Sequence, residues 1–268
     1  MIGRLAAALC LLAMPAAALD LHGDLVQGAL VTGAVEPGSR VLLGGKAIAV
    51  GADGVFVFGF GRDQAAAAQL TVIHPDGKVE QRHLAVAQRR YDIQRIDRLD
   101  SNMVTPDATT QARIQAEQAK INAARQVSTP DRGFLGPFLW PARGPVSGVY
   151  GSQRILNGEP RQPHFGLDIA APEGSPVIAP AAGVVRLAEP DFYLTGGTVI
   201  LDHGFSVSST FIHMQDIAVA VGQKLQPGDL IGHVGRKGRA TGPHLHWAMN
   251  WGEVRVDPQL LLPPAPAD

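Results

Sequence analysis

The sequence predicts a mostly β protein in which a small N-terminal β-sandwich and a C-terminal β domain are joined by one helix. Two observations support this fold class. The 268 residues include 31 glycines and 20 prolines but only 6% aromatic residues, which indicates many turns and short strands. Short apolar stretches alternate with turn signals in both halves of the chain, and a segment rich in Ala and Gln separates them. With 46% hydrophobic residues, the chain can form a core in each domain.

Residues 1–18 are predicted to be a secretory signal peptide. An arginine precedes the apolar run Leu5–Met14, and Ala16 and Ala18 then occupy the small-residue positions of an A-x-A cleavage site. The run is too short to cross about 30 Å of hydrocarbon. We therefore expect an exported protein that does not span the membrane, with a mature chain that begins near Leu19 and resides in the periplasm or outside the cell.

Cysteine content and charge exclude several function classes. Cys10 is the only cysteine and lies within the predicted signal, so the mature chain has no disulfide, thiol nucleophile or thiolate ligand. Any metal must then be bound by histidine and carboxylate side chains. The 23 basic and 24 acidic residues leave a formal charge of -1, which gives no indication of binding to nucleic acid or to an anionic membrane.

The segment from residue 20 to about residue 100 is predicted to be the small β-domain. Apolar stretches such as Val55–Phe58 and Leu70–Ile73 are separated by turn signals such as Pro75–Gly77. Strands at this spacing are typical of a small sandwich. The histidines of this segment lack metal-ligand spacing, and we interpret them as ordinary strand or surface residues.

One helix is predicted over Thr109–Gln126, inside a helical linker of residues 105–130. Ile114 and Ile121 are seven positions apart, with alanines on the same side, so the helix has a narrow apolar stripe. Such a helix can connect two domains, pack over one of them or bind a partner, and the sequence favours the connector. The β-domain and the helix are candidate surfaces for a protein partner.

Residues 134–262 form the predicted C-terminal domain, followed by a proline-rich tail, residues 263–268, that we expect to be disordered. The domain contains His164 and Asp168, four positions apart. In an extended strand their Cα atoms would be roughly 13 Å apart, too far to share one ion. The backbone must therefore bend between them, and Gly166 permits such a bend.

A second histidine motif lies near the end of this domain. Polar and apolar residues alternate through His244, Leu245, His246, Trp247 and Met249, which predicts a strand with two faces. The two histidines point the same way, about 6–7 Å apart, while the apolar side chains face the core. At that separation, one ring can bind a metal while the other reaches a water or a substrate oxygen beside it.

These motifs resemble those of the lysostaphin-like and LytM-like zinc endopeptidases of peptidase family M23, which cleave peptidoglycan cross-links. The HxxxD motif of the family matches His164 and Asp168, its HxH motif matches His244 and His246, and its central histidine matches His213. The resemblance extends from about residue 140 to residue 258. Further stretches that agree with the family are Ser147–Gly151, Gly174–Val177, Ala182–Val185 and Gly222–Gly228.

The resemblance implies an antiparallel β domain of the LytM type that binds one zinc ion per chain. The ligands would be His164, Asp168 and His246, which leaves one tetrahedral position open for water or substrate. His213 and His244 would be catalytic, because they could move protons and stabilise the oxyanion. Which of the two does which stays open. The sequence departs from the common family pattern at Phe211, where a tyrosine often stands.

The resemblance also implies a function. The expected activity is that of a secreted zinc metalloendopeptidase, most simply a DD-endopeptidase, that hydrolyses peptide cross-links between the peptide stems of peptidoglycan. Two other interpretations are an inactive module that binds the wall or activates another hydrolase, and a zinc peptidase with a protein substrate. The presence of all five site residues favours an active enzyme over the inactive module.

Overall fold

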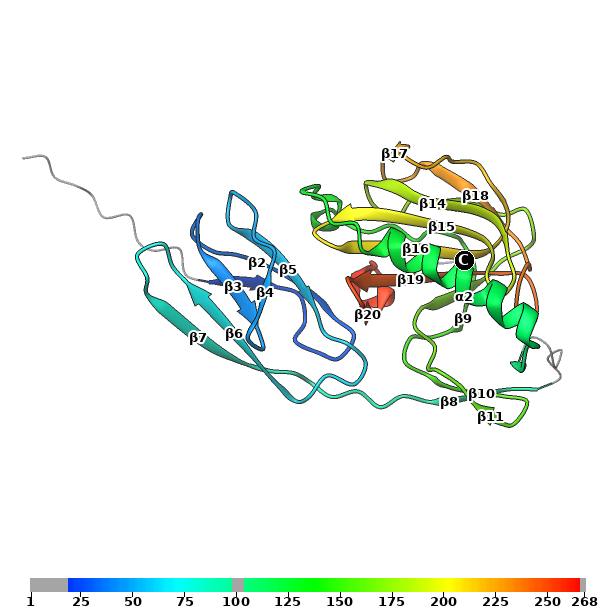
Figure 1. The fold of residues 1–268 in the computed structure, drawn as a ribbon, viewed down its shortest axis with the longest axis horizontal. Coiled ribbons are helices and arrows are strands. Elements are labelled where there is room, and N and C mark those ends of the chain that lie inside the picture. The colour runs from blue at the N-terminus through cyan, green and yellow to red at the C-terminus, as the bar shows by residue number, and fades with distance from the viewer. Residues whose placement is uncertain (1–18, 98–103, 266–268) are drawn as a thin grey trace, which may run out of the picture.

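The computed structural model describes residues 19–97 and 104–265. The predicted signal peptide lies outside the described residues, as does the end of the predicted tail. Within the described ranges the chain is mostly β, with one long helix between an N-terminal β region and a C-terminal antiparallel sheet (Figure 1). The fold class predicted from the sequence is confirmed.

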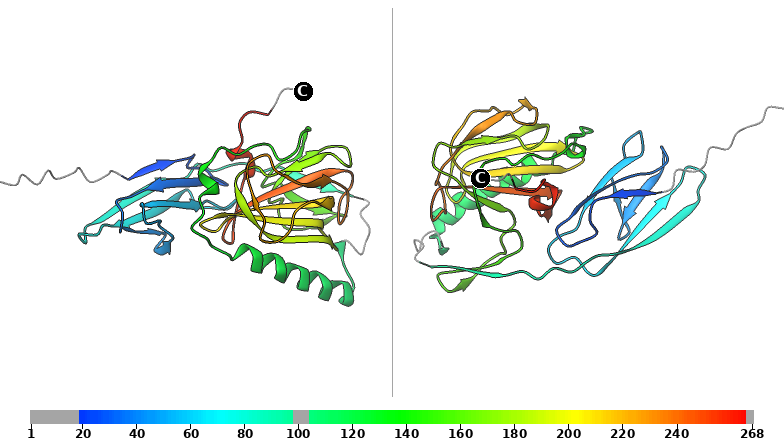
Figure 2. Two further views of the ribbon diagram at one scale, coloured as in Figure 1. Left: turned by 90° about the horizontal axis from the view of Figure 1, so that it is seen from above. Right: turned by 180° about the vertical axis from the view of Figure 1, so that it is seen from behind.

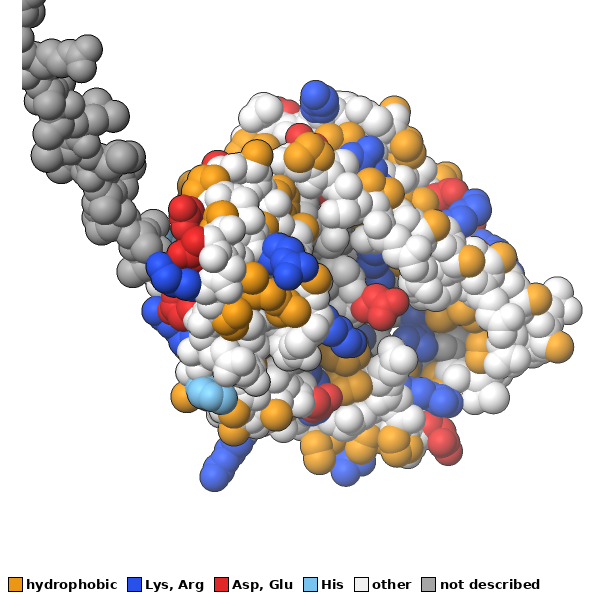
Figure 3. Space-filling view, turned by 60° about the vertical axis from the view of Figure 1, so that its left-hand side comes forward, with side chains coloured by type: hydrophobic (Ala, Val, Ile, Leu, Met, Phe, Trp, Pro, Cys, Tyr) orange, Lys and Arg blue, Asp and Glu red, His pale blue; other side chains and the backbone are white. Residues whose placement is uncertain are grey.

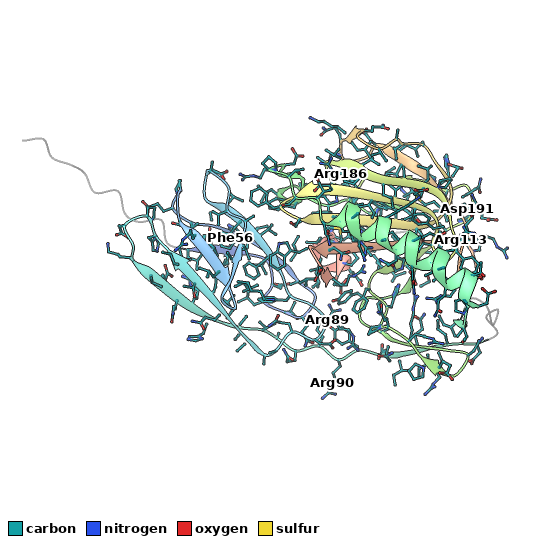
Figure 4. All side chains as sticks on the ribbon, viewed as in Figure 1. Phe56, Arg89, Arg90, Arg113, Arg186 and Asp191 are labelled. Carbon is teal, nitrogen blue, oxygen red and sulfur yellow. The ribbon has the colours of Figure 1, made fainter. Side chains whose placement is uncertain are left out.

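The N-terminal region contains two small sheets that share one apolar core. The first sheet consists of β1 (Asp20–His22), β2 (Leu30–Ala34) and β5 (Val55–Gly59), and the second of β4 (Lys46–Ile48), β3 (Arg40–Leu43), β6 (Ala67–Ile73) and β7 (Val79–Ala85). Phe56 (Figure 4) and Phe58 of β5 are fully buried, and their rings stack with centroids 6.2 Å apart. Burial of such large side chains between the sheets stabilises a domain of this size.

The chain then leaves the sandwich and runs along the C-terminal domain. Strand β8 (Ile93–Ile96) pairs in parallel with β10 (Gln153–Leu156), which pairs in turn with β11 (Glu159–Pro160). This pairing joins segments about sixty positions apart, so it was not visible in the sequence. As a result, Gln94 and Ile96 line a cavity of the C-terminal domain.

The long helix α2 (Ala108–Arg125) confirms the predicted helix to within one residue at each end. It begins at Asp107, whose side chain accepts a hydrogen bond from the backbone N–H of Thr110. Figure 2 shows the helix lying along the outside of the C-terminal sheet. Its buried residues, Ile121 and Ala124, pack against apolar side chains of two strands of that sheet. The helix therefore both connects the two regions and covers one face of the second.

The C-terminal sheet is antiparallel, and its main path runs in the order β17-β14-β15-β16-β19-β12-β9, with β13, β18 and β20 attached. Its strands are β9 (Val146–Gly148), β12 (Leu167–Ala170), β13 (Pro176–Ile178), β14 (Gly183–Phe192), β15 (Gly196–Gly204), β16 (Val207–Ile217), β17 (Lys224–Leu225), β18 (Leu230–Val234), β19 (His244–Trp251) and β20 (Val254–Val256). Two short 3-10 helices, Gly133–Leu135 and Pro258–Leu261, flank the domain. Leu245, Trp247 and Met249 of β19 are fully buried, as their alternation predicts.

The two regions are in direct contact. Arg89 donates a hydrogen bond of 2.7 Å to the buried carboxylate of Asp257, and Leu30 and Val57 belong to the apolar core of the C-terminal domain.

On the face of the molecule in Figure 3, positively and negatively charged side chains are mixed. No helix in residues 19–97 and 104–265 is both long and apolar enough to cross a membrane.

Candidate metal centre and active site

The structure brings His164, Asp168 and His246 together at one point. Asp168 Oδ1 lies 3.0 Å from His164 Nε2 and 2.7 Å from His246 Nδ1, and the two ring nitrogens are 2.9 Å apart. These three side chains each offer one ligand atom, so among the described residues they form a group that could hold a metal ion. His164 and Asp168 are buried and His246 is nearly so.

Strand pairing explains part of this convergence. Asp168 of β12 and His246 of β19 are direct cross-strand partners, so their side chains leave the sheet on the same face. His164 lies three residues before β12. Its Nδ1–H donates to the carbonyl oxygen of Val149 at 2.9 Å, so its Nε2 directs a lone pair toward the other two residues.

Gly166 is needed for a different reason from the one the sequence suggests. It is not among the glycines with positive φ. A Cβ at this position would lie 2.6 Å from Cε1 of His246 and 2.7 Å from the carbonyl oxygen of Trp247. Gly166 thus permits the close approach of the His246 ring, rather than an unusual backbone conformation.

The second oxygen of the Asp168 carboxylate has its own partner. Arg154 of β10 donates to Asp168 Oδ2 at 3.0 Å, and this leaves Oδ1 for the two histidines. A Cβ at Gly148 would lie 2.3 Å from the same Oδ2, so β9 also limits the position of the carboxylate. Arg154 was not predicted from the sequence, because it lies outside the motifs and its contact with Asp168 depends on the small sheet of β8, β10 and β11.

Burial and hydrogen bonds control the charge of these groups. Burial alone would raise the pKa of Asp168, but the close contacts of its carboxylate with the His164 and His246 rings outweigh it and hold the pKa well below its usual value. Burial lowers the pKa of His246 to about 4, although Asp168 acts in the opposite direction. At neutral pH the site therefore contains an ionised carboxylate and a neutral His246 imidazole.

This donor set fits a zinc ion. With His164 protonated at Nδ1 and Asp168 ionised, three electron-rich atoms converge with at most one proton, on His246 Nδ1, between them. Ligand atoms about 2.0–2.2 Å from a tetrahedral zinc lie about 3.3–3.6 Å apart, so movements of a few tenths of an ångström would complete the site. Two imidazoles and one carboxylate are a common set for a catalytic zinc.

His213 and His244 stand beside this group. The centroids of their rings are 4.7 Å apart, and His244 Nε2 lies 3.9 Å from Asp168 Oδ1. His213 Nδ1–H donates to the carbonyl oxygen of Lys237 at 2.7 Å, and His244 Nδ1–H donates to that of Gly242 at 2.9 Å. In both rings the Nε2 atom is therefore the one left for a substrate or a water.

His213 has two further unusual properties. Its backbone φ is 66°, in the left-handed region that residues other than glycine rarely adopt. Burial, with a smaller contribution from His244 and His246, lowers its pKa to about 3. His213 is therefore a neutral imidazole at neutral pH, which is the form that can accept a proton.

The other histidines of the C-terminal domain have protein partners elsewhere. His203 is fully buried and hydrogen-bonds to the carbonyl oxygen of Ala182 at 2.7 Å and to Ser209 Oγ at 2.8 Å. His233 lies 2.7 Å from the carboxylate of Asp216. Neither joins the cluster around Asp168.

Two cavities meet at the site. One of about 230 Å³ is lined by Gln94, Asp168 and His244, and one of about 370 Å³ is lined by His164 and His246. Residues that line both are Arg154, Leu156, His213 and Arg239. The histidine cluster thus lies between two open spaces rather than at the end of a closed pocket.

Comparisons with known proteins agree with this geometry. The family model of peptidase family M23 matches residues 162–258, which include all five site residues. A crystal structure from Pseudomonas aeruginosa, described as a peptidase M23, is 30% identical and superimposes with a TM-score of 0.69; the match covers 89% of this chain and 95% of that one.

Curated relatives match over shorter stretches of the chain. The peptidoglycan DD-endopeptidase ShyA of Vibrio cholerae is 40% identical over 87 residues, 32% of this chain and 20% of that protein. The DD-carboxypeptidase/endopeptidase Mpg of Neisseria meningitidis is 36% identical over 104 residues, 38% of this chain and 24% of that protein. The chain thus spans no more than a quarter of the length of these two relatives. The motifs, the fold and the near full-length structural match together show that the chain belongs to peptidase family M23.

Proposed function

We propose that the protein is an exported, zinc-dependent endopeptidase that hydrolyses peptide cross-links of bacterial peptidoglycan, acting as a DD-endopeptidase. The observation that carries the proposal is the convergence of His164 Nε2, Asp168 Oδ1 and His246 Nδ1 within 3.0 Å of one another, with His213 and His244 beside them. The names of two relatives, one a peptidoglycan DD-endopeptidase and one a DD-carboxypeptidase/endopeptidase, support the substrate class.

His164, Asp168 and His246 would hold the zinc ion. Zinc bound there supplies a Lewis acid that makes a water more acidic and polarises the scissile carbonyl. Val149 and Arg154 would orient two of the ligands, because they bind the ligand atoms that face away from the ion. Such outer contacts reduce the freedom of the ligands and therefore favour metal binding.

His213 and His244 would carry the proton chemistry. Both rings donate to a backbone carbonyl from Nδ1, so Nε2 of each neutral ring can accept a proton and, once protonated, can donate a hydrogen bond. One would remove a proton from the attacking water and later pass it to the leaving amine, and the other, in its protonated form, would donate a hydrogen bond to the oxygen of the tetrahedral species. Burial keeps the His213 ring neutral at neutral pH, so its Nε2 can accept a hydrogen bond from the water.

The two cavities support cleavage within a peptide. An endopeptidase must accommodate substrate on both sides of the scissile bond, and the cavities of about 230 and 370 Å³ extend from the histidine cluster. Strand β8 contributes Gln94 to one cavity, and helix α2 contributes Gln118 and Arg125 to the other. Segments upstream of the C-terminal sheet would therefore contact the substrate.

Mass spectrometry of cross-linked wall fragments tests this function. The purified chain is incubated with the fragments in the presence of zinc, in the presence of a chelator, and as the His246→Ala variant. We expect cleavage of dimers into monomers in the first sample alone, and the masses identify the bond. Absence of cleavage by the zinc-loaded chain, or equal cleavage in all three samples, would contradict the proposal.

A further inference from the structure

The larger cavity beside the histidine cluster is strongly basic. Its lining includes Gln118 and Ile121 of helix α2 on one side and His246 and Ala248 of β19 on the other. Five arginines line it, and neither aspartate nor glutamate is among its lining residues. The five are Arg125, Arg154, Arg161, Arg239 and Arg255. A whole-chain charge of -1 makes this local excess of positive charge a specific feature of the cavity.

Arg125 and Arg255 have no carboxylate partner among the described residues. Arg154 is paired with Asp168, as shown above. Arg125, by contrast, donates to the hydroxyl of Thr210 at 3.0 Å, and within residues 19–97 and 104–265 it forms no ion pair. Arg255 donates to the side-chain oxygen of Asn250 at 3.4 Å, and it too lacks an ion pair in the part of the chain that the structure describes.

Both guanidinium groups are partly buried, and the charge of Arg255 affects Arg125. Burial lowers the pKa of Arg125 to about 9, and the charge of Arg255 contributes to the lowering. Burial also lowers the pKa of Arg255. Two like charges that are withdrawn from water and not neutralised are unfavourable, and an anion between them would remove this penalty.

The strand register shows where these arginines lie relative to His246 in the metal centre. Ile212 pairs with His246, Thr210 pairs with Ala248, and Arg255 of β20 pairs with Asn250. His246, Ala248 and Asn250 alternate along β19 and so share one face, with successive members about 7 Å apart. Arg125, bound to Thr210, is therefore about one such step from His246, and Arg255 is about two steps away.

We infer that Arg125 and Arg255 form a carboxylate-binding subsite for the peptide substrate. This inference rests on the proposed peptidase function and adds a substrate requirement to it. An extended peptide spans about 3.3–3.6 Å per residue, so the recognised carboxylate would belong to a residue about two to four positions from the scissile bond. Guanidinium groups bind carboxylates through two parallel hydrogen bonds, which fixes the position of the peptide as well as its affinity.

The carboxylate could be the C-terminal group of a stem peptide or a side-chain group, and both have the same chemistry. Synthetic cross-linked dimers with each free carboxylate converted in turn to an amide distinguish these sources. Binding of the dimers is measured first, with chelator-treated protein. This measurement does not depend on metal-assisted cleavage. We expect the free acid to bind about 10- to 100-fold more tightly than the dimer amidated at the recognised position.

Variants identify the residues that are responsible. Arg125→Gln and Arg255→Gln should each reduce or abolish the preference for the free acid, while binding of the amidated dimer changes little. Arg90→Gln is the control, because Arg90 is exposed and points away from the C-terminal domain (Figure 4). It should keep the full preference. A variant that merely loosens the fold would weaken binding of both dimers and would leave their ratio unchanged.

Activity with zinc completes the test. The same dimers should differ in kcat/KM by a similar factor in the unaltered protein, mainly through KM. Equal binding of every dimer by the unaltered protein, absence of binding, or an unchanged preference in both arginine variants would overturn the subsite. A clear preference in binding without any cleavage by the zinc-loaded protein would instead contradict the proposed peptidase function and leave the subsite standing.

Discussion

Arg154 Nη2 lies 3.0 Å from Asp168 Oδ2, on the side of the carboxylate opposite to the oxygen that faces the two histidines. The side chain of Arg154 is 22% exposed and that of Asp168 is 8% exposed, so the pair is sheltered from water. The arginine therefore holds the carboxylate with one oxygen directed at the proposed zinc site. A residue that orients a ligand in this way affects metal binding without touching the metal.

Arg154→Gln is expected to weaken zinc binding by about 10- to 100-fold, because Asp168 loses the contact that orients it. Competition with a chromophoric chelator measures the affinity. Arg186→Gln is the matched control, since Arg186 makes a similar bond of 2.9 Å to the buried carboxylate of Asp202 on β15. The control should lose stability but keep its zinc affinity. Equal zinc affinity of Arg154→Gln and the unaltered protein would refute the orienting role.

Gly166→Ala is expected to displace the His246 ring, because the new Cβ would lie 2.6 Å from Cε1 of that ring. Overpacking of this kind costs about 1–3 kcal/mol, which corresponds to a loss of about fivefold or more in zinc affinity if the strain falls on the ligand. Gly136→Ala is the control, because Gly136 has a φ of -76° and its nearest contact would be 3.8 Å away. Full zinc affinity in Gly166→Ala would show that the ring has room to move.

His213→Asn should keep zinc and lose most turnover. Asparagine tolerates the left-handed backbone that His213 adopts, with φ of 66°, so the local fold should survive. Loss of a group that transfers protons lowers kcat by about 100- to 10,000-fold. Metal analysis after dialysis is measured alongside kcat, with His246→Ala as the variant expected to lose both. If zinc leaves together with the His213 side chain, His213 is a ligand and the proposed division of roles is wrong.

Stability should fall in mild acid because of His203. Burial lowers the pKa of His203 to about 4, whereas in the unfolded chain it is about 6.5. Between about pH 6.5 and pH 4, His203 is therefore protonated in the unfolded state but neutral in the folded state. The free energy of unfolding consequently decreases as the pH falls through this interval, by up to about 3 kcal/mol.

Urea unfolding at pH 7 and pH 4.5, with chelator present to remove metal effects, measures this loss. In His203→Gln, the free energy of unfolding should decrease less between the two pH values, because most of the contribution of His203 is absent. His83→Gln serves as the control, because His83 is exposed. An identical decrease in the unaltered protein and in His203→Gln would mean that other groups cause the acid sensitivity.

Local patterns were the features that the sequence could reveal. The alternation around His244 and His246 defined a strand face, and the composition before Val127 defined helix α2 to within one residue at each end. Arg154 and Gln94 were not predicted, because they reach the site through the parallel β8–β10 pair, which joins distant segments. Gly166 was identified, but as a bend, since close approach to a ring from another strand cannot be read from neighbouring residues.

The central claim is that one zinc ion, bound by His164, Asp168 and His246, is required for cleavage. Titration of zinc into chelator-treated protein, with cleavage of a cross-linked wall dimer measured at each step, tests it most directly. We predict that activity rises from zero and reaches its maximum at one equivalent per chain, and that His246→Ala recovers no activity at any concentration. Full activity without metal, or the same recovery in His246→Ala as in the unaltered protein, would contradict the claim.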